Sequence, residues 1–273
     1  MKRISTSLVQ QILLICLSLV SLYPLWFVVQ TALKTPQAYA VDPSGLPRAP
    51  TLANFLSLFQ VMPFGRWTLN SLVVSVVSVA AATLIAVMAA YAITFGRFFG
   101  QRVFFNLNIA LMALPPVALV VPLFTLMVQA RLINTLPSVM LVYTVLLIPF
   151  SMFFLVNFFR ELPLELIEAA TIDGASHARI LFRIVMPLSV ATTATLVIVN
   201  AIWVWNELLF ALVFLQNNDQ RTLMAGLTLF QGRYSTNEPL VMAGAFLSIL
   251  PLVVLYLASQ SFFVRGMTAG IGK

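Results

Sequence analysis

One short segment, EAATIDGASHARILFRIVMP, gathers charged and small side chains between two long apolar runs, from Glu168 to Pro187. It holds the only histidine of the chain, His177. Glu168 offers a carboxylate to an arginine or lysine of another protein, and Ala169 and Ala170 are small enough for a close approach. The chemistry that these residue types support is the docking of a protein partner. The alternative is a solvated loop whose charges only orient the chain.

The wider segment, residues 160–187, has the pattern of two short helices with a break between them. Pro163 suits a first helical turn, and Gly174 suits the end of that helix because glycine enters the left-handed conformation without strain. Ser176 can cap the second helix. In that helix an i, i+3, i+4, i+7 spacing predicts an apolar face, with Arg179 and Arg183 on another face. The apolar positions are Ala178, Leu181, Phe182 and Val185.

A second group of polar residues lies inside an apolar run. Asn200, Trp203 and Glu207 are spaced to share one face of a helix, with Asn206 beside them. Glu207 is the only acidic residue that we place within a span, and intramembrane charges mark functional sites. Sugar hydroxyls need hydrogen-bonding partners while the apolar face of a sugar stacks on aromatic rings, so these residues are candidates for a substrate path. The alternative is that they hydrogen-bond neighbouring helices or interfacial water.

Patterns for catalysis and nucleotide binding are missing from the sequence. Its lysines, Lys2, Lys34 and Lys273, end no G-x-x-x-x-G-K-[ST] pattern, so there is no phosphate-binding loop. The single histidine and the single cysteine, Cys16, lie far apart, which argues against a metal site. An intramembrane protease would need a base within a span, where His177 does not lie. We therefore expect no cofactor, metal or enzyme activity in this chain, and an energy source in another chain or an ion gradient.

The amino-acid composition indicates that much of the protein surface is in contact with lipid. Hydrophobic residues make up 61% of the 273 residues and charged residues only 8%, whereas soluble domains carry about 25% charged residues. The net charge of +7 could indicate nucleic acid, but the basic residues stand singly at the ends of apolar runs, which is typical of membrane orientation. We predict an all-α membrane protein with a lipid environment and no nucleic-acid partner.

Six apolar stretches are long enough to cross a membrane, which takes about 20 residues. They are 9–32, 68–95, 103–129, 137–159, 188–214 and 240–263, within a single domain, 1–273. Lysine and arginine favour an orientation with both termini inside. Residues 160–187 then face the cytoplasm between spans four and five, while loops 34–66 and 215–239 face outward. Kinks are expected at Pro115, Pro116, Pro122, Pro149 and Pro251.

The polar segment also carries a longer pattern: E-A-A, three residues, G, nine residues, I-x-L-P. It is matched by Glu168-Ala169-Ala170, Gly174 and Ile184-Val185-Met186-Pro187, with Met186 in place of leucine, a swap of similar volume. The pattern resembles the cytoplasmic signature loop of binding-protein-dependent (MetI-like) ABC importer permeases. Further stretches are similar to the sugar-transporting branch, close to the second maltose-type permease subunit. They are AYAITFGRF (90–98), INTLPSVMLVY (133–143), WNELLFALVFL (205–215) and FFVRGMTAGIGK (262–273).

This resemblance implies a coupling helix that seats in a groove of a separate ATPase subunit and transmits its ATP-driven closure to the spans, which alternate between inward-open and outward-open states. The residues assigned to ATPase coupling are Glu168, Ala169, Ala170, Gly174, Ile184 and Pro187, with His177 and Arg179 beside them. The implied partners are a second permease subunit in a heterodimer, two ATP-binding subunits that hold ATP and Mg, and an extracytoplasmic substrate-binding protein. The implied location is the bacterial inner membrane.

Two other classes compete with this interpretation. An ion-coupled secondary carrier or channel needs intramembrane charges, for which Glu207 alone is available. An intramembrane enzyme lacks its residues. Which sugar or polyol is carried, whether this subunit contacts it, and whether a second copy of the chain takes the place of the heterodimer partner stay open.

Overall fold

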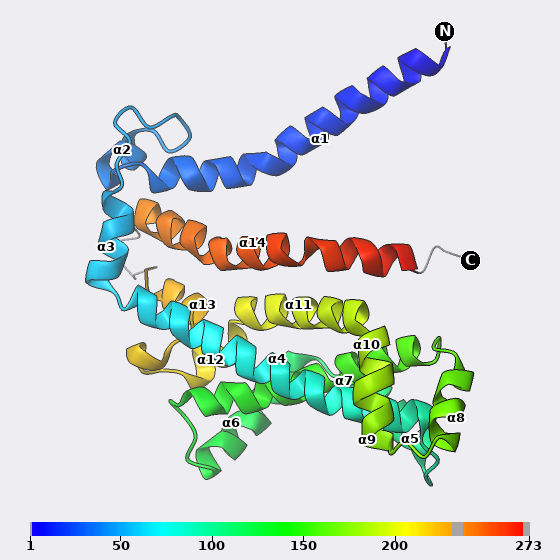
Figure 1. Cartoon of the computed structure of the whole chain (residues 1–273). Helices are drawn as coiled ribbons and strands as arrows, with labels where there is room; N and C mark the ends of the chain where they lie inside the picture. The colour runs from blue at the N-terminus through cyan, green and yellow to red at the C-terminus, as the bar shows by residue number, and fades with distance from the viewer. Residues whose placement is uncertain (1, 231–236, 270–273) are drawn as a thin grey trace. The chain divides into compact units, whose positions relative to one another are not determined.

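The computed structural model of the chain describes residues 2–230 and 237–269 (Figure 1), and every regular element in these ranges is helical. The all-α prediction is therefore confirmed. The chain divides into two compact units, one of Met1–Arg66 with Gly226–Pro251 and one of Trp67–Ala225 with Leu252–Lys273. The polar segment and the candidate substrate-path residues all belong to the second unit.

Four helices are long and apolar enough to cross a membrane. They are α1 (Lys2–Ala32), α4 (Phe64–Phe95), α7 (Leu136–Phe159) and α14 (Glu238–Ala269). Two bent pairs of helices raise the number to six if each pair is one span. The orientation with both termini inside depends partly on Lys2, Arg3, Arg265 and Lys273, whose side chains lie outside the described residues, and it stays a prediction.

The third apolar stretch is broken rather than kinked. Helix α5 (Gln101–Leu111) is followed by a 3-10 turn, η1 (Pro116–Leu119), and by α6 (Val120–Gln129). The two parts meet at 98°. Consecutive prolines explain the break, because Pro115 and Pro116 together remove two backbone donors and the first of them disfavours helical geometry at Leu114. Pro122 lies in the first turn of α6, where a missing N–H costs little.

The fifth apolar stretch also consists of two helices. Helix α11 (Val190–Asn206) is followed by Glu207, whose backbone is extended, and then by α12 (Leu209–Phe214). Glu207 therefore does not lie within a continuous span, as the sequence had suggested, but at a break. The chain continues through η3 (Asn218–Gln220), α13 (Leu223–Leu227) and η4 (Thr228–Phe230). Residues 231–236 of the predicted outer loop lie outside the described residues.

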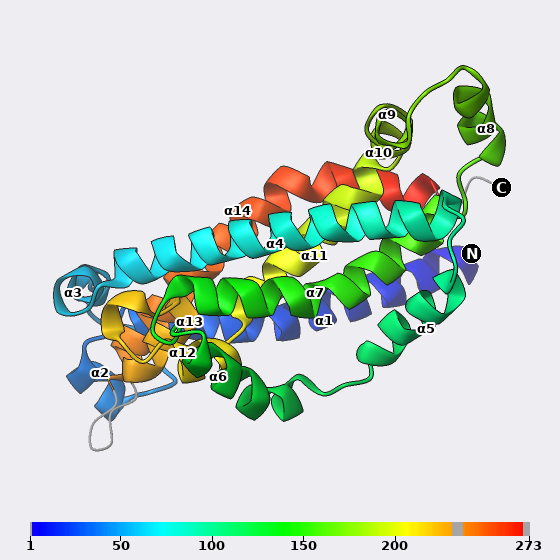
Figure 2. The same ribbon diagram turned by 90° about the horizontal axis from the view of Figure 1, so that it is seen from below.

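Within the second unit, α4 and α7 run side by side (Figure 2), and the hydroxyl of Ser78 donates to the carbonyl of Met140 across them, at 3.2 Å. Ala82, Ala86 and Ala90 are fully buried at four-residue intervals, which lets α4 pack closely against its neighbours. Asn108 of α5 donates to the carbonyl of Pro149 in α7, at 3.0 Å. Lipid offers no hydrogen-bonding partner, so an amide in the membrane is satisfied by a bond to a neighbouring helix.

The first unit contains α2 (Pro36–Val41) and α3 (Ala53–Val61), on either side of a proline-rich loop. Lys34 is 2% exposed, and its ammonium donates to the carbonyls of Asp42 and Pro43, both at 2.9 Å. The amide of Asn54 donates to the carbonyls of Ala32 and Lys34, at 2.7 and 2.8 Å. Buried polar side chains need hydrogen-bonding partners, and here the partners are backbone carbonyls. The bonds of Lys34 therefore hold the start of the proline-rich loop in place.

Candidate functional site

The polar segment begins with α8 (Leu164–Ile172), which carries the E-A-A sequence. Pro163 is its N-cap rather than a residue of its first turn. At the other end Gly174 has a φ of +76°, as predicted. The N–H of Gly174 donates to the carbonyl of Thr171 at 3.1 Å, and the N–H of Ala175 donates to that of Ala170 at 2.9 Å. This pair of bonds is the Schellman motif, which requires a left-handed residue where Gly174 lies.

The second half of the segment is α9 (His177–Ile180), a π turn, η2 (Leu181–Val185), and α10 (Met186–Leu188). The Ser176 hydroxyl caps α9 by accepting from the N–H of Arg179, as predicted. The predicted apolar face is only half right, since Leu181 and Val185 are buried while Ala178 and Phe182 are exposed. The buried positions are Ile180, Leu181 and Val185, and the π turn from Leu181 to Val185 departs from the α-helical spacing on which the prediction depended.

Apolar contacts hold this segment on the spans. Ile167, Ile180, Leu181 and Val185 belong to one buried cluster with residues of α4, α5 and α7. Ala170, Ala175 and Ile184 pack against the same cluster. The guanidinium of Arg160 lies 4.9 Å from the ring centroid of Phe105 in α5. Displacement of the segment would therefore disturb the ends of several spans.

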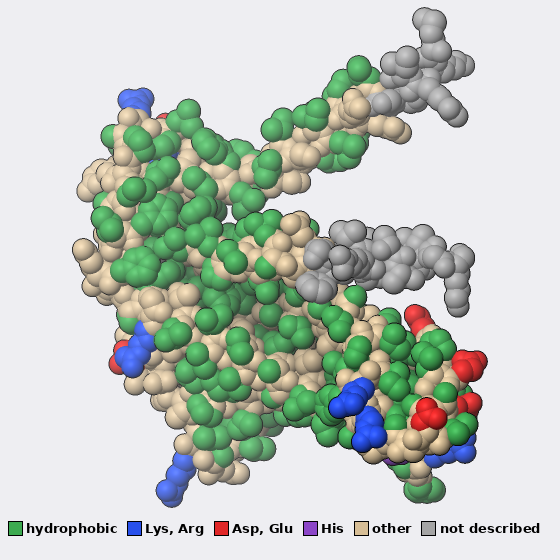
Figure 3. All heavy atoms as spheres, in the orientation of Figure 1, with side chains coloured by type: hydrophobic (Ala, Val, Ile, Leu, Met, Phe, Trp, Pro, Cys, Tyr) green, Lys and Arg blue, Asp and Glu red, His purple; other side chains and the backbone are tan. Residues whose placement is uncertain are grey.

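The opposite face of α8 is open. Glu165, Glu168, Ala169 and Ile172 follow i, i+3, i+4, i+7 spacing and are all exposed, Ile172 by 86%. Figure 3 shows acidic and basic side chains gathered over the polar segment, in contrast to the mostly apolar surface elsewhere in this view. The described part of the chain shows no hydrogen bond or ion pair to the carboxylate of Glu168. This face can thus receive a partner without first breaking an internal contact.

The remaining predicted coupling residues differ in placement. Arg179 is exposed, Ile184 is partly buried, and Pro187 lies in the first turn of α10. The chain bends by 80° between His177–Leu188 and Val190–Asn206, just after Pro187, where a bend was expected. His177 is exposed, but its Nδ1 lies 3.2 Å from the hydroxyl oxygen of Tyr91 in α4. It therefore faces the spans as well as the surface.

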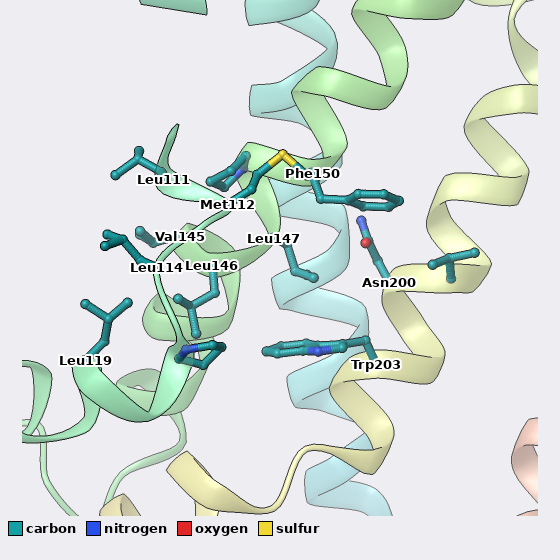
Figure 4. A pocket seen from close by; sticks show the side chains of 13 residues that line it. Leu111, Met112, Leu114, Leu119, Val145, Leu146, Leu147, Phe150, Asn200 and Trp203 are labelled. Carbon is teal, nitrogen blue, oxygen red and sulfur yellow. The ribbon is translucent and has the colours of Figure 1, made fainter. Parts of the chain in front are cut away.

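The candidate substrate path centres on a cavity of about 460 Å³ in the second unit (Figure 4). It opens where the third stretch is broken, between the end of α5, η1, α7 and α11. Its wall is mostly apolar: Leu111, Met112, Leu114, Pro116, Leu119, Val145, Leu146, Leu147, Pro149, Phe150 and Val199. The polar contributions are the amide of Asn200 and the indole of Trp203, both from α11. A few polar groups in an apolar wall are typical of small-molecule sites.

Asn200 and Trp203 line the cavity together but are also bound to α7. Asn200 is 1% exposed, and its Nδ2 donates to the hydroxyl of Ser151 at 2.9 Å. The Ser151 hydroxyl donates in turn to the carbonyl of Leu147, at 2.7 Å. The ring of Trp203 meets that of Tyr143 edge to face, with centroids 5.8 Å apart. The expected hydrogen bond to a neighbouring helix is thus present, and it coexists with a place in the cavity wall.

Glu207 and Asn206 are not among the residues that line this cavity. The carboxylate of Glu207 accepts from the Tyr143 hydroxyl and from the N–H groups of Phe210 and Ala211, at 3.1 and 3.3 Å for the two backbone bonds. It thereby caps α12. The Asn206 amide donates to the carbonyl of Ile202 in its own helix, at 2.8 Å. We call Tyr143, Ser151, Asn200, Trp203 and Glu207 the α7–α11 junction.

Three residues of these sites were missed in the sequence: Tyr91, Tyr143 and Ser151. Each stands in a long apolar helix and bonds to a predicted site residue. Their only signal is that they are polar residues within spans, where such groups need partners. No cluster of three or more histidine, cysteine, aspartate or glutamate side chains suited to a metal ion occurs in the described ranges.

Residues 82–269 match a protein family described as the binding-protein-dependent transport system inner membrane component. The chain belongs to this family. The resemblance drawn from the polar segment is confirmed, and the protein is a multi-pass inner-membrane permease whose working partners are the other components of such a system.

Relatives cover nearly the whole permease. The sulfoquinovosyl glycerol transport system permease protein SmoH of Agrobacterium fabrum is 38% identical over 91% of this chain and 88% of its own length. The arabinooligosaccharides transport system permease protein AraQ of Halalkalibacterium halodurans is 35% identical over 84% and 80%. The melibiose/raffinose/stachyose import permease protein MelC of Bacillus subtilis is 32% identical over 92% and 91%.

The fold also matches a solved structure. A chain from the crystal structure of a bacterial ABC transporter involved in the import of the acidic polysaccharide alginate superimposes with a TM-score of 0.83. The match covers 94% of the permease and 96% of that chain, at 23% sequence identity. Identity this low supports the fold and nothing finer.

Proposed function

We propose that this permease is the transmembrane subunit of an ATP-driven ABC importer for a sugar or a related polyol. The names of three relatives that span most of the chain refer to glycosides or oligosaccharides. The permease itself supplies no phosphate-binding loop. As membership of the family implies, two separate ATP-binding subunits would hold ATP and Mg, a second permease subunit would complete the pathway as a heterodimer, and an extracytoplasmic binding protein would deliver the substrate.

The observation that carries this proposal is the open face of α8 on a segment fixed to the spans. Glu168 can pair with a basic side chain of the ATPase, while Ala169 permits close approach and Ile172 adds apolar contact. The buried side of the same segment packs on α4, α5 and α7. ATP-driven closure of the ATPase pair would thus push on residues that lie directly on the membrane helices.

The cavity beside the α7–α11 junction supports a place for this subunit in the substrate path. Trp203 offers an aromatic face for a pyranose ring, and Asn200 offers an amide beside it (Figure 4). The rest of the wall is apolar, so few hydrogen bonds would hold a sugar here. A weakly binding passage suits transport, in which substrate must leave as readily as it enters.

The main alternative is an ion-coupled carrier, which needs an intramembrane charge free to bind and release an ion. The carboxylate of Glu207 instead accepts three hydrogen bonds from the protein. Uptake by intact cells separates the two mechanisms. Our proposal requires that uptake survive collapse of the ion gradient by an uncoupler while ATP is maintained, and that it stop when ATP is depleted. The reverse result would favour the carrier.

Site-directed crosslinking tests the docking role directly. The chain has one cysteine, Cys16, so Cys16→Ser gives a cysteine-free background. We expect Glu168→Cys in that background to crosslink to a co-purifying ATPase subunit. Arg131→Cys is the matched control, because Arg131 is exposed at the opposite end of α7 from the polar segment. If Glu168→Cys gives no ATPase adduct, or if both positions give the same adduct, the docking assignment fails.

A further inference from the structure

His177 was grouped with the coupling residues, but its observed bond points toward the membrane helices. Its Nδ1 lies 3.2 Å from the hydroxyl oxygen of Tyr91, and the two rings meet edge to face with centroids 6.1 Å apart. Tyr91 is 7% exposed. Of the side-chain hydrogen bonds described in the structure, this is the one that joins residues 160–189 to another helix.

Tyr91 leads on to two spans through aromatic contacts. Its ring lies 5.4 Å from that of Phe95, one turn further along α4. Phe95 stacks on Phe159, the last residue of α7, with centroids 6.4 Å apart. All three rings touch or belong to the apolar cluster under the polar segment. The histidine is thus the first member of a continuous row of rings that ends on α7.

We propose that His177 is a positioning residue, which fastens α9 to α4 through Tyr91 so that movement of the polar segment is passed to α4 and α7. Apolar contacts alone permit a short helix to slide, because dispersion has no preferred direction. A hydrogen bond of defined length and angle fixes the register of α9 on α4. This role differs from contact with the ATPase, and it rests on the proposed function.

Either tautomer of a neutral imidazole preserves this bond. With the proton on Nε2, Nδ1 accepts from the tyrosine hydroxyl; with the proton on Nδ1, the imidazole donates to the tyrosine oxygen. Asparagine carries an oxygen or nitrogen close to the position of Nδ1, so His177→Asn can keep the bond. His177→Phe keeps the ring contact and loses the bond. Tyr91→Phe removes the same bond from the other side.

The test uses the assembled complex in proteoliposomes, with the purified extracytoplasmic binding protein as the probe. Its stimulation of ATP hydrolysis requires a signal that passes through the spans and the polar segment, whereas basal hydrolysis does not. We expect Tyr91→Phe to leave basal hydrolysis unchanged. In Tyr91→Phe and in His177→Phe, the stimulation, measured relative to the basal rate of the same variant, should fall by about fivefold, the factor that matches the net strength of an ordinary hydrogen bond. The double variant should lose no more than either single one.

Two controls make the result specific. His177→Asn should restore the stimulation, and Asn157→Ala should leave it intact, because the one bond of the Asn157 amide among the described residues is to the carbonyl of Phe153 in its own helix. Unchanged stimulation in both phenylalanine variants, or additive losses in the double variant, would overturn the inference. If the complex with Tyr91→Phe does not assemble, His177→Phe still tests the inference, because position 177 is exposed. Absence of stimulation in the unsubstituted complex would instead count against the proposed function.

Discussion

The polar segment and the α7–α11 junction both gather polar side chains in a mostly apolar chain, and they use them in opposite ways. In the polar segment Glu168 and Arg179 are exposed and the buried positions are apolar. At the junction Asn200 and Tyr143 are buried, and each donates a hydrogen bond to another helix or its end, Asn200 to Ser151 and Tyr143 to Glu207. One region offers its polar groups to a partner, and the other employs them between its own helices.

The difference follows from the solvent. A charged group beside water keeps its hydration until a partner replaces it, so leaving it unpaired costs little. A polar group inside the membrane finds no water, and an unsatisfied one costs far more than a net hydrogen bond gains. Substitutions at the junction should therefore act first on stability. Substitutions on the open face of α8 should act on transport alone.

The largest effect is expected for Glu207→Ala. It removes the acceptor for the Tyr143 hydroxyl, which is fully buried, and for two N–H groups of α12. Loss of charged hydrogen bonds and of a helix cap should destabilise the permease by about 4 kcal/mol. Thermal melting of the detergent-purified complex measures this. Glu207→Gln should recover part of the loss. A variant that melts normally but binds substrate poorly would contradict the structural role and restore Glu207 as a ligand.

The next largest loss of stability is expected for a substitution of Asn200. Asn200→Leu keeps the branched shape of the side chain, although its methyl groups are larger, and loses the bond to Ser151, which should cost about 1.5 kcal/mol. Ser151→Ala removes the same bond from α7, so the two substitutions together should cost little more than either alone. Melting of the single and double variants gives the comparison. Uptake kinetics then test the cavity: a raised KM in Asn200→Leu but not in Ser151→Ala would assign Asn200 a contact with substrate beyond its structural bond.

Local rules predicted much of the polar segment. The stop at Gly174, the cap at Ser176 and the bend after Pro187 each depend on a few adjacent residues, and all are present. The π turn was not predicted, because a single extra residue per turn follows from packing against α4 and α7 rather than from the spacing of Leu181 and Phe182. Sequence periodicity assumes one helix type throughout.

Predictions within the membrane were coarser. Apolar length located the stretches, but it could not distinguish a kink from a break at Pro115 and Pro116, which depends on whether neighbouring helices satisfy the freed backbone. The shared face of Asn200, Trp203 and Glu207 assumed that α11 continues past Asn206, where it ends. The partners Tyr91, Tyr143 and Ser151 come from other helices, and pairing across helices is not encoded in local spacing.

A smaller effect is expected for Gly174→Ala, for which the chain offers a matched control. Gly174 and Gly100 have φ values of +76° and +83°, and a Cβ would meet nothing within 4 Å at either position. Alanine in this left-handed conformation should cost about 1 kcal/mol at both. Melting should therefore shift equally in the two variants, whereas uptake should fall only in Gly174→Ala, because only this turn shapes the end of α8. Equal uptake in both variants would mean that the turn at Gly174 has no role in coupling.

The smallest effect on stability is expected for Glu168→Ala, and it tests the comparison most sharply. Glu168 is exposed in the middle of α8, alanine is the better helix former, and no hydrogen bond or ion pair within the described part of the chain is lost. Melting of the permease should stay unchanged while uptake and recovery of the ATPase subunit fall. Glu161→Ala is the control and should transport normally, because Glu161 is also exposed and lies before α8. A lower melting temperature in Glu168→Ala would mean that its carboxylate is used internally after all, and normal uptake would mean that the open face of α8 has no partner.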